Sequence, residues 1–316
     1  MPMKPISLTK WITTCFCMLA LLLIAASCKK QEAAPAPQKS GKPVQGIMTS
    51  AGGRPFRIGM GAMITPREGF TYYNQLKEYI EQRFGQPIQL IDRGNYSEIN
   101  HLLETGDIDA AFVCSGPYVE GKERFGMQLL AMPLVKGKPI YHSYIIVPQE
   151  SPARKLEDLR GKTFAFTDPK SNTGKLVPTY MLAKIGETPQ HFFSKIEHTY
   201  GHDNSIRAVA EQLVDGAAID SLVWEYLAIK TPDLTAKTRI LLRSEPYGIP
   251  PFVVRPGISA GQKEKLKQIL LHAADDEEGR RILKGMMIDG FVPGDDRNYD
   301  TIRAMNSCLV GQEKQQ

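Results

Sequence analysis

Three short polar residues, Ser171, Asn172 and Thr173, stand between an apolar run and a helical pattern. Residues 164–166 predict a buried strand, and apolar residues recur at helical spacing over 176–185. The first backbone N–H groups of a helix have no partner within it and carry partial positive charge. Hydroxyl and amide groups at that point could hold an oxyanion, although the same residue types are also preferred as plain helix caps.

Polar side chains follow three other predicted strands, each time directly before a helical pattern. Where strands and helices alternate, the strands run parallel and ligands bind beyond their carboxyl ends. The side chains are Ser115, His202 with Asp203, and Asp220. Of these, Ser115 falls, like Ser171, at a strand end where sheets of this kind bind ligands.

Neutral donors of this kind suit a tetrahedral oxyanion. Burial of such an anion without partners is prohibitive, whereas each charge-assisted hydrogen bond contributes roughly 1.5–3 kcal/mol. A handful of such bonds, less the costs of closure and desolvation, supports micromolar or tighter binding. No Lys or Arg is required, and we predict no catalytic residue, metal or cofactor.

Asp220 is the acid that could select among anions. Next to a bound oxyanion its carboxylate is repelled unless a proton lies between the two groups. Phosphate, phosphite and phosphonates carry such a proton near neutral pH and sulfate does not, so the acid favours protonated phosphorus oxyanions. The alternative is that Asp220, like Asp203, only caps the helix that follows it. His202 is either a packed turn residue or a cation that pairs with the ligand.

The N-terminus has the pattern of an export signal over residues 1–27. Two lysines precede an apolar run that is too short for a comfortable transmembrane helix. Small residues directly before Cys28 are similar to a bacterial lipobox, in which that cysteine is acylated and becomes the mature N-terminus; an ordinary cleaved signal is the alternative. Residues 28–53 are rich in Ala, Pro, Gln and Lys and predict a flexible tether.

The composition is that of a soluble globular protein, with 42% apolar and 23% charged residues. A formal net charge of +5 is too mild for a nucleic-acid surface, and we predict no nucleic-acid partner. Outside the signal and Cys28, the cysteines are Cys114 and Cys308, far apart in sequence. Two buried thiols are expected, and a disulfide between them stays open.

Strands and helices alternate twice along the folded part, which predicts an α/β protein with two lobes. Each lobe is expected to hold a mainly parallel sheet flanked by helices. Lobe 1 comprises residues 54–140 and 248–316, and lobe 2 comprises residues 141–247. Two β-rich extended segments near the lobe boundaries predict two crossover strands. Two lobes joined in this way form a hinged clamshell with a cleft between them.

Over residues 56–295 the sequence resembles the phosphonate-binding family of ABC-transporter substrate-binding proteins, within the type II periplasmic binding proteins. The motifs that carry the resemblance are Asp168-Pro169-x-Ser171-x-x-Gly174-x-Leu176-Val177-Pro178, Gly201-His202-Asp203, Val214-Asp215-Gly216-Ala217 and Tyr73-x-x-Leu76-x-x-Tyr79. The family implies an oxyanion (phosphate, phosphite or phosphonate) held between the lobes and delivered to an ABC transporter permease. With Cys28 acylated, the protein is anchored to a bacterial membrane and faces the periplasm or the exterior.

The resemblance also implies roles for individual residues. Its trio of anion-binding residues falls on Ser171, Asn172 and Thr173, where Asn172 departs from the usual hydroxyl. The family histidine falls on His202, and Asp203 takes the place of an acid that meets the amine of aminophosphonates. Further positions are Tyr118, with Ser115 as an added candidate, and from the first lobe Thr65 and Tyr73.

Other classes of function fit less well. A hydrolase is possible in principle because Ser, His and Asp are present, but no Gly-x-Ser-x-Gly elbow occurs. His198 and His202 have the spacing of a helical metal pair, but Gly201 breaks the helix between them. A sensor with the same fold, or a binder of a different small anion, stays an alternative to the transport component.

Overall fold

The computed structural model describes residues 54–61 and 70–313. The predicted signal peptide and tether, with Cys28, lie outside these residues, and so does Thr65. Within the described ranges, none of the helices has both the length and the apolar character needed to cross a membrane.

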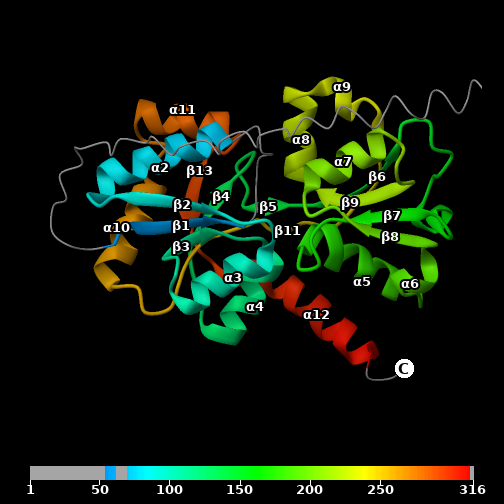
Figure 1. Ribbon diagram of the computed structural model, residues 1–316, viewed down its shortest axis with the longest axis horizontal. Helices are drawn as coiled ribbons and strands as arrows, with labels where there is room; N and C mark the ends of the chain where they lie inside the picture. The colour runs from blue at the N-terminus through cyan, green and yellow to red at the C-terminus, as the bar shows by residue number, and fades with distance from the viewer. Residues whose placement is uncertain (1–53, 62–69, 314–316) are drawn as a thin grey trace, which may run out of the picture. The chain divides into compact units, whose positions relative to one another are not determined.

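The first sheet has six strands in the order β13-β4-β12-β3-β1-β2. Helices α2, α10 and α11 lie on one side of β1 and β2, and α3 and α4 lie on the other (Figure 1). The strands are β1 (Phe56–Met60), β2 (Ile88–Asp92), β3 (Ala110–Phe112), β4 (Gln128–Leu134), β12 (Phe252–Val254) and β13 (Gly290–Pro293). The helices are α2 (Phe70–Phe84), α3 (Tyr96–Thr105), α4 (Ser115–Phe125), α10 (Ala260–Leu271) and α11 (Glu277–Gly285).

The second sheet has five strands in the order β10-β6-β9-β7-β8. Helices α5 and α6 lie on one side of it, and α7, α8 and α9 lie on the other (Figure 1). The strands are β6 (Ser143–Pro148), β7 (Thr163–Phe166), β8 (Lys195–His198), β9 (Gly216–Asp220) and β10 (Thr238–Arg243). The helices are α5 (Val177–Ala183), α6 (Pro189–Phe192), α7 (His202–Ala210), α8 (Ser221–Lys230) and α9 (Pro232–Thr235).

The chain passes between the two sheets twice, and the two crossings pair with each other. Strand β5 (Ile140–Tyr141) leads from the first sheet to the second, and β11 (Tyr247–Gly248) leads back. They form an antiparallel two-stranded ladder in which Tyr247 faces Tyr141. The last helix, α12 (Asp300–Glu313), contacts both α4 and α5.

Both sheets are mixed, whereas we expected mainly parallel ones. The strands that helices connect do run parallel, as β1 does with β2 and β3 and as β7 does with β8 and β9. The reversed strands include β6 and β12, the first strand of each sheet after a crossing. Each crossing brings the chain to the carboxyl ends of the parallel strands. The strand that enters the sheet from there therefore has to run in the opposite direction.

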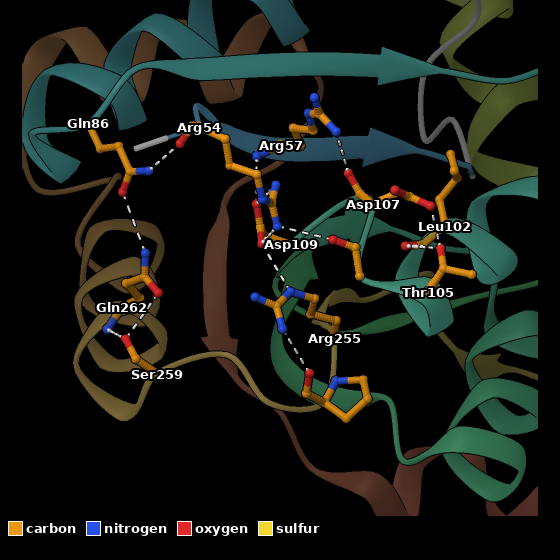
Figure 2. A network of polar contacts seen from close by, with 12 residues as sticks. Arg54, Arg57, Gln86, Leu102, Thr105, Asp107, Asp109, Arg255, Ser259 and Gln262 are labelled. Carbon is orange, nitrogen blue, oxygen red and sulfur yellow. Dashed lines mark hydrogen bonds and ion pairs between the residues drawn. The ribbon is translucent and has the colours of Figure 1, made fainter. Parts of the chain in front are cut away.

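A buried ion-pair network closes the first sheet at the edge where its parallel strands begin. Asp109 directly precedes β3, and the side chain is only 6% exposed. It accepts hydrogen bonds from both Arg54 and Arg255, with nitrogen–oxygen distances of 2.7 and 3.0 Å (Figure 2). The backbone N–H of Arg57 donates to the same carboxylate at 3.0 Å. These charges therefore join three segments of the sheet at the edge opposite to the polar turns.

Candidate ligand-binding site

The turn after β7 is a tight π-helical turn over Asn172–Leu176 that continues into α5. Ser171 caps it, because its Oγ accepts a hydrogen bond from the backbone N–H of Gly174 at 3.0 Å. A Cβ atom at Gly174 would lie 1.7 Å from the Thr167 Oγ1, so any larger residue there collides with the end of β7. The capping interpretation of Ser171 is therefore confirmed, and its hydroxyl hydrogen can still be donated elsewhere.

Asn172 and Thr173 are completely buried, and each has a polar atom without a partner. The Asn172 Nδ2 donates to the Tyr141 hydroxyl at 3.0 Å, and its backbone N–H points to the Cys114 sulfur at 3.5 Å. The Asn172 Oδ1 and the Thr173 Oγ1 have no hydrogen-bond partner among the described residues. Buried polar groups in native structures are normally paired, so these two atoms are available to a ligand.

The start of α4 packs directly against this turn. Cys114 is the residue before the helix, and burial raises the pKa of its thiol to about 11, so it stays neutral. The Ser115 Oγ donates to the carbonyl oxygen of Gly248, on the returning crossover, at 2.6 Å. A Cβ at Gly116 would lie 2.8 Å from the carbonyl oxygen of Lys170. Glycine therefore permits the close approach of the two helix starts.

His202 and Asp220 meet where β9 ends and α7 begins. The backbone N–H of Asp220 donates to the His202 Nδ1 at 3.0 Å, so in the neutral ring the hydrogen sits on Nε2. Burial lowers the pKa of His202 to about 3 and raises that of Asp220 to about 8. Both groups are therefore neutral at pH 7. The Asp220 Oδ1 also accepts from the backbone N–H of Leu222 at 2.7 Å, so its expected capping role is present as well.

Tyr96, the first residue of α3, completes this group from the other sheet. Its hydroxyl oxygen lies 3.5 Å from the His202 Nε2, and its backbone N–H donates to the Asp168 Oδ2 at 3.1 Å. Burial is the main cause of the raised pKa of Tyr96, and the neighbouring Cys114 and Asp168 add to it. Burial is likewise the main cause of the raised pKa values of Tyr141 and Cys114.

These residues form one buried, mostly uncharged group, which we call the interlobe cluster. It gathers the ends of β7 and β9 and the starts of α3, α4 and α7, with β5 alongside. Its members are the half-buried Tyr96 and the buried residues Cys114, Ser115, Tyr141, Asn172, Thr173, His202 and Asp220.

Sequence reasoning missed two tyrosines of the cluster and gave Cys114 no role. Tyr96 follows a predicted strand and opens a helical pattern, as Ser115 and Asp220 do, so the same signal could have found it. Tyr141 opens the crossover segment, which has to line the space between the lobes. Nothing in the sequence around Cys114 distinguishes a thiol in a binding site from one in a core.

The structure does not bring four of the expected residues into the interlobe cluster. Tyr118 is buried, but its hydroxyl donates to the Asp296 Oδ1 at 2.6 Å. Tyr73 packs its ring edge-on against Phe112 in the first core. Asp203 is half-buried in the first turn of α7, and Ser171 borders a groove between α4 and α12 that neither Asn172 nor Thr173 lines.

The metal and disulfide alternatives find no support in the described part of the chain. It contains no group of three or more residues that could hold a metal ion. His198 lies in β8, with its ring tilted against Phe166. Cys114 and Cys308 are both free, the first buried and the second exposed, so they do not pair, and the expectation of two buried thiols is wrong for Cys308.

Two mixed sheets, two paired crossings and polar turns that meet between them define a two-lobed binding protein of the type II periplasmic class. The structure of PhnD1 from Prochlorococcus marinus, in complex with methylphosphonate, has this fold: its TM-score to this chain is 0.74 at 18% identity, over 81% of this chain and 98% of that one. Its similarity to this chain therefore extends over almost the whole of the solved domain.

The family model for periplasmic substrate-binding proteins of phosphonate ABC transporters matches residues 58–299, and the chain belongs to that family. Members of the family bind substrates for transport and are not enzymes. The chain is 25% identical to the phosphonates-binding periplasmic protein of Escherichia coli K12 over 219 residues, 68% of this chain and 64% of that protein, so the match spans less than two thirds of that relative. It is 26% identical to the phosphate-import protein PhnD of Mycolicibacterium smegmatis over 262 residues, 77% of this chain and 81% of that protein.

Proposed function

We propose that this protein captures a phosphorus oxyanion (phosphate, phosphite or a phosphonate) in the interlobe cluster and delivers it to the permease of an ABC importer. The observation that carries the proposal is the pair of unpartnered, fully buried polar atoms on Asn172 and Thr173. They lie at the start of a helical segment, where backbone N–H groups favour an anion.

The cluster carries almost no charge of its own and offers neutral hydrogen-bond donors, which supports an anion as its ligand. Burial keeps His202 neutral, with a hydrogen on the Nε2 that lies 3.5 Å from the Tyr96 hydroxyl oxygen, and it keeps Asp220 protonated near neutral pH. The Thr173 hydroxyl adds a neutral donor to the cluster. Hydrogen bonds to a charged group contribute roughly 1.5–3 kcal/mol each, so a few of them support micromolar or tighter affinity after the cost of closure.

Ser115, Ser171, Asn172, Thr173, His202 and Asp220 are the proposed ligand-binding residues. Asp203, at the first turn of α7, is proposed to meet a ligand amine, and Thr65 is a further candidate from lobe 1. The proposed lobes are residues 54–140 with 248–316 and residues 141–247. Acylation of Cys28 after removal of the signal at 1–27 anchors the protein to the membrane, with residues 28–53 as the tether.

Calorimetric titration of the purified protein with phosphate, phosphite, methylphosphonate and 2-aminoethylphosphonate tests this function, with sulfate as the control. We expect at least one phosphorus anion to bind with micromolar or tighter affinity and sulfate to bind far more weakly. Equal affinity for sulfate would show that the site does not select oxyanions that carry a proton. Absence of binding to all four phosphorus ligands would refute the proposed function itself.

A further inference from the structure

The short segment between β7 and the turn at 171–173 is bonded to two helices of the first sheet. Asp168 makes the first contact, and its two carboxylate oxygens have separate partners. Oδ1 accepts from the backbone N–H of Lys170 at 2.7 Å, within the segment itself. Oδ2 accepts from the backbone N–H of Tyr96, the first residue of α3, at 3.1 Å. A carboxylate is favourable at the start of a helix, so this buried acid joins its own turn to a helix of the other lobe.

Lys170 makes the second contact, with α4. Its ammonium lies 3.1 and 3.0 Å from the two carboxylate oxygens of Glu120. Its backbone approaches the same helix closely, because a Cβ at Gly116 would lie 2.8 Å from the Lys170 carbonyl oxygen. Both charged side chains border the groove between α4 and α12 and are partly exposed, so solvent screens the ion pair without removing it.

The two contacts join the proposed lobes at a place other than the ladder of β5 and β11. Helices α3 and α4 belong to lobe 1, and residues 168–170 belong to lobe 2. Bending about the ladder that opens the interlobe cluster therefore separates both pairs of groups. Neither Asp168 nor Lys170 is a member of the cluster, so the free energy of these contacts favours the closed arrangement and is independent of contact with the ligand.

We propose that Asp168 and Lys170 form a latch with the Tyr96 N–H and Glu120, which holds the two lobes together around the ligand and so sets the affinity of the site without touching the ligand. This rests on the proposed function and assigns the closing contacts of the same site. Apparent affinity falls in proportion to the population of the binding-competent form. One exposed ion pair changes such an equilibrium by about two- to fivefold.

Glu120→Lys distinguishes the latch from a general effect of charge. The substitution adds positive charge beside the site, which by itself should strengthen the binding of an anion and speed its association. The latch predicts weaker binding, because the new side chain repels Lys170 where Glu120 attracts it. We expect the affinity for methylphosphonate to fall about 4- to 25-fold through faster dissociation, as measured by calorimetric titration and stopped-flow kinetics.

A charge swap and a matched control complete this test. Glu120→Lys combined with Lys170→Glu keeps the net charge and restores an ion pair of reversed polarity, so affinity should return to within about threefold of the natural value. Glu123→Lys is the control, because Glu123 lies on the same helix and borders the same groove but pairs with Arg303 of lobe 1 at 3.5 Å. This variant should bind methylphosphonate as tightly as the natural protein or more tightly.

Proline at position 96 tests the contact of Asp168. The first residue of a helix tolerates proline, and Asn95 before it is extended, with φ −147° and ψ 161°, as the residue before a proline requires. Tyr96→Pro removes both the side chain and the N–H that Asp168 accepts, whereas Tyr96→Ala removes the side chain alone. Tyr96→Pro should therefore bind about two- to tenfold more weakly than Tyr96→Ala.

The outcomes separate the latch from the proposed function. Unchanged or tighter binding by Glu120→Lys, or a charge swap that binds no better than Glu120→Lys alone, would overturn the latch while leaving the function intact. Equal affinities of the two Tyr96 variants would remove Asp168 from it. Failure of the natural protein to bind methylphosphonate, phosphate or phosphite would overturn both.

Discussion

Two clusters of polar side chains flank α4, and they are built in opposite ways. The Asp296 cluster comprises Tyr118, Lys122, Asp296 and Arg303; the carboxylate accepts from the Tyr118 hydroxyl at 2.6 Å and pairs with Lys122 at 2.8 Å and Arg303 at 2.7 Å. Each charge has a partner, since Arg303 also pairs with Asp300 at 2.8 Å. Burial would raise the pKa of Asp296, but the hydrogen bonds from Lys122, Tyr118 and Arg303 outweigh it and lower that pKa to about 2.

The interlobe cluster is more deeply buried and nearly free of charge, yet it leaves hydrogen-bonding atoms unused. Its acid and its histidine are both neutralised by burial, and the Asn172 and Thr173 oxygens have no partner among the described residues. The contrast is between a carboxylate whose partners all lie within the fold and two buried atoms whose partner we propose to be the ligand. Substitutions in the two clusters should therefore have opposite effects on stability and affinity.

Thr173→Val should have the largest effect and should separate the two properties. It removes a buried hydroxyl without a partner, so the free energy of unfolding should stay unchanged or rise by about 1 kcal/mol. Loss of a hydrogen bond to a charged ligand should weaken affinity by about 10- to 100-fold. Urea denaturation and calorimetric titration of the same variant measure the two effects.

Thr238→Val is the matched control for that substitution. Thr238 is equally buried in the second lobe, but its Oγ1 accepts from the Trp224 indole at 3.1 Å and donates to the Thr235 carbonyl oxygen at 2.9 Å. This variant should lose about 1–2 kcal/mol of stability and keep its affinity. If both threonine variants lose stability equally, the Thr173 hydroxyl contributes to the folded state as much as the hydrogen-bonded Thr238 hydroxyl does, and the comparison between the two groups fails.

A pH scan should also distinguish the clusters. The folded-state pKa of His202 is lowered to about 3, below its unfolded value of about 6.5, so the unfolded state binds more protons below pH 6.5. The contribution of His202 to the free energy of unfolding is therefore complete above pH 6.5. It decreases as the pH falls, by about 2 kcal/mol at pH 5. His202→Gln should remove this part of the difference between pH 7 and pH 5 in urea denaturation.

The Asp296 cluster should not change the free energy of unfolding between pH 7 and pH 5. The folded-state pKa of Asp296 is lowered to about 2, so its stabilising contribution is complete above the unfolded value of about 3.9 and is lost only below it. Asp296→Asn should therefore keep the natural difference between pH 7 and pH 5. An unchanged difference in His202→Gln would count against burial of a neutral imidazole.

Tyr118→Phe should have the smallest effect. The substitution removes one hydrogen bond to Asp296, so the free energy of unfolding should drop by about 1 kcal/mol, and affinity should change less than twofold. Titration with methylphosphonate checks the second point. A large loss of affinity would show that Tyr118 contacts the ligand, as the family resemblance implies.

The order of strands and helices could be predicted from the sequence because the elements are short and periodic and several end at a glycine, as α3 does at Gly106 and α4 at Gly126. The positions of Ser115, Asn172 and Asp220 at strand ends followed from the same pattern. The reversed direction of β6 and β12 could not be predicted, since it depends on where the crossings enter each sheet. The partner of the Tyr118 hydroxyl could not be predicted either, because Asp296 is remote in sequence and approaches only once the chain is folded.

The ladder between β5 and β11 has a mechanical consequence. Two strands of two residues each, paired side by side, carry both links between the sheets. Bending about such a narrow ladder disturbs few backbone dihedrals, whereas twisting one sheet relative to the other would shear the pairing between Tyr141 and Tyr247. The Tyr141 hydroxyl also accepts a hydrogen bond from the Asn172 amide, so this ladder is in direct contact with a proposed ligand-binding residue, and a ligand held there would bear on the segment about which the two sheets can bend.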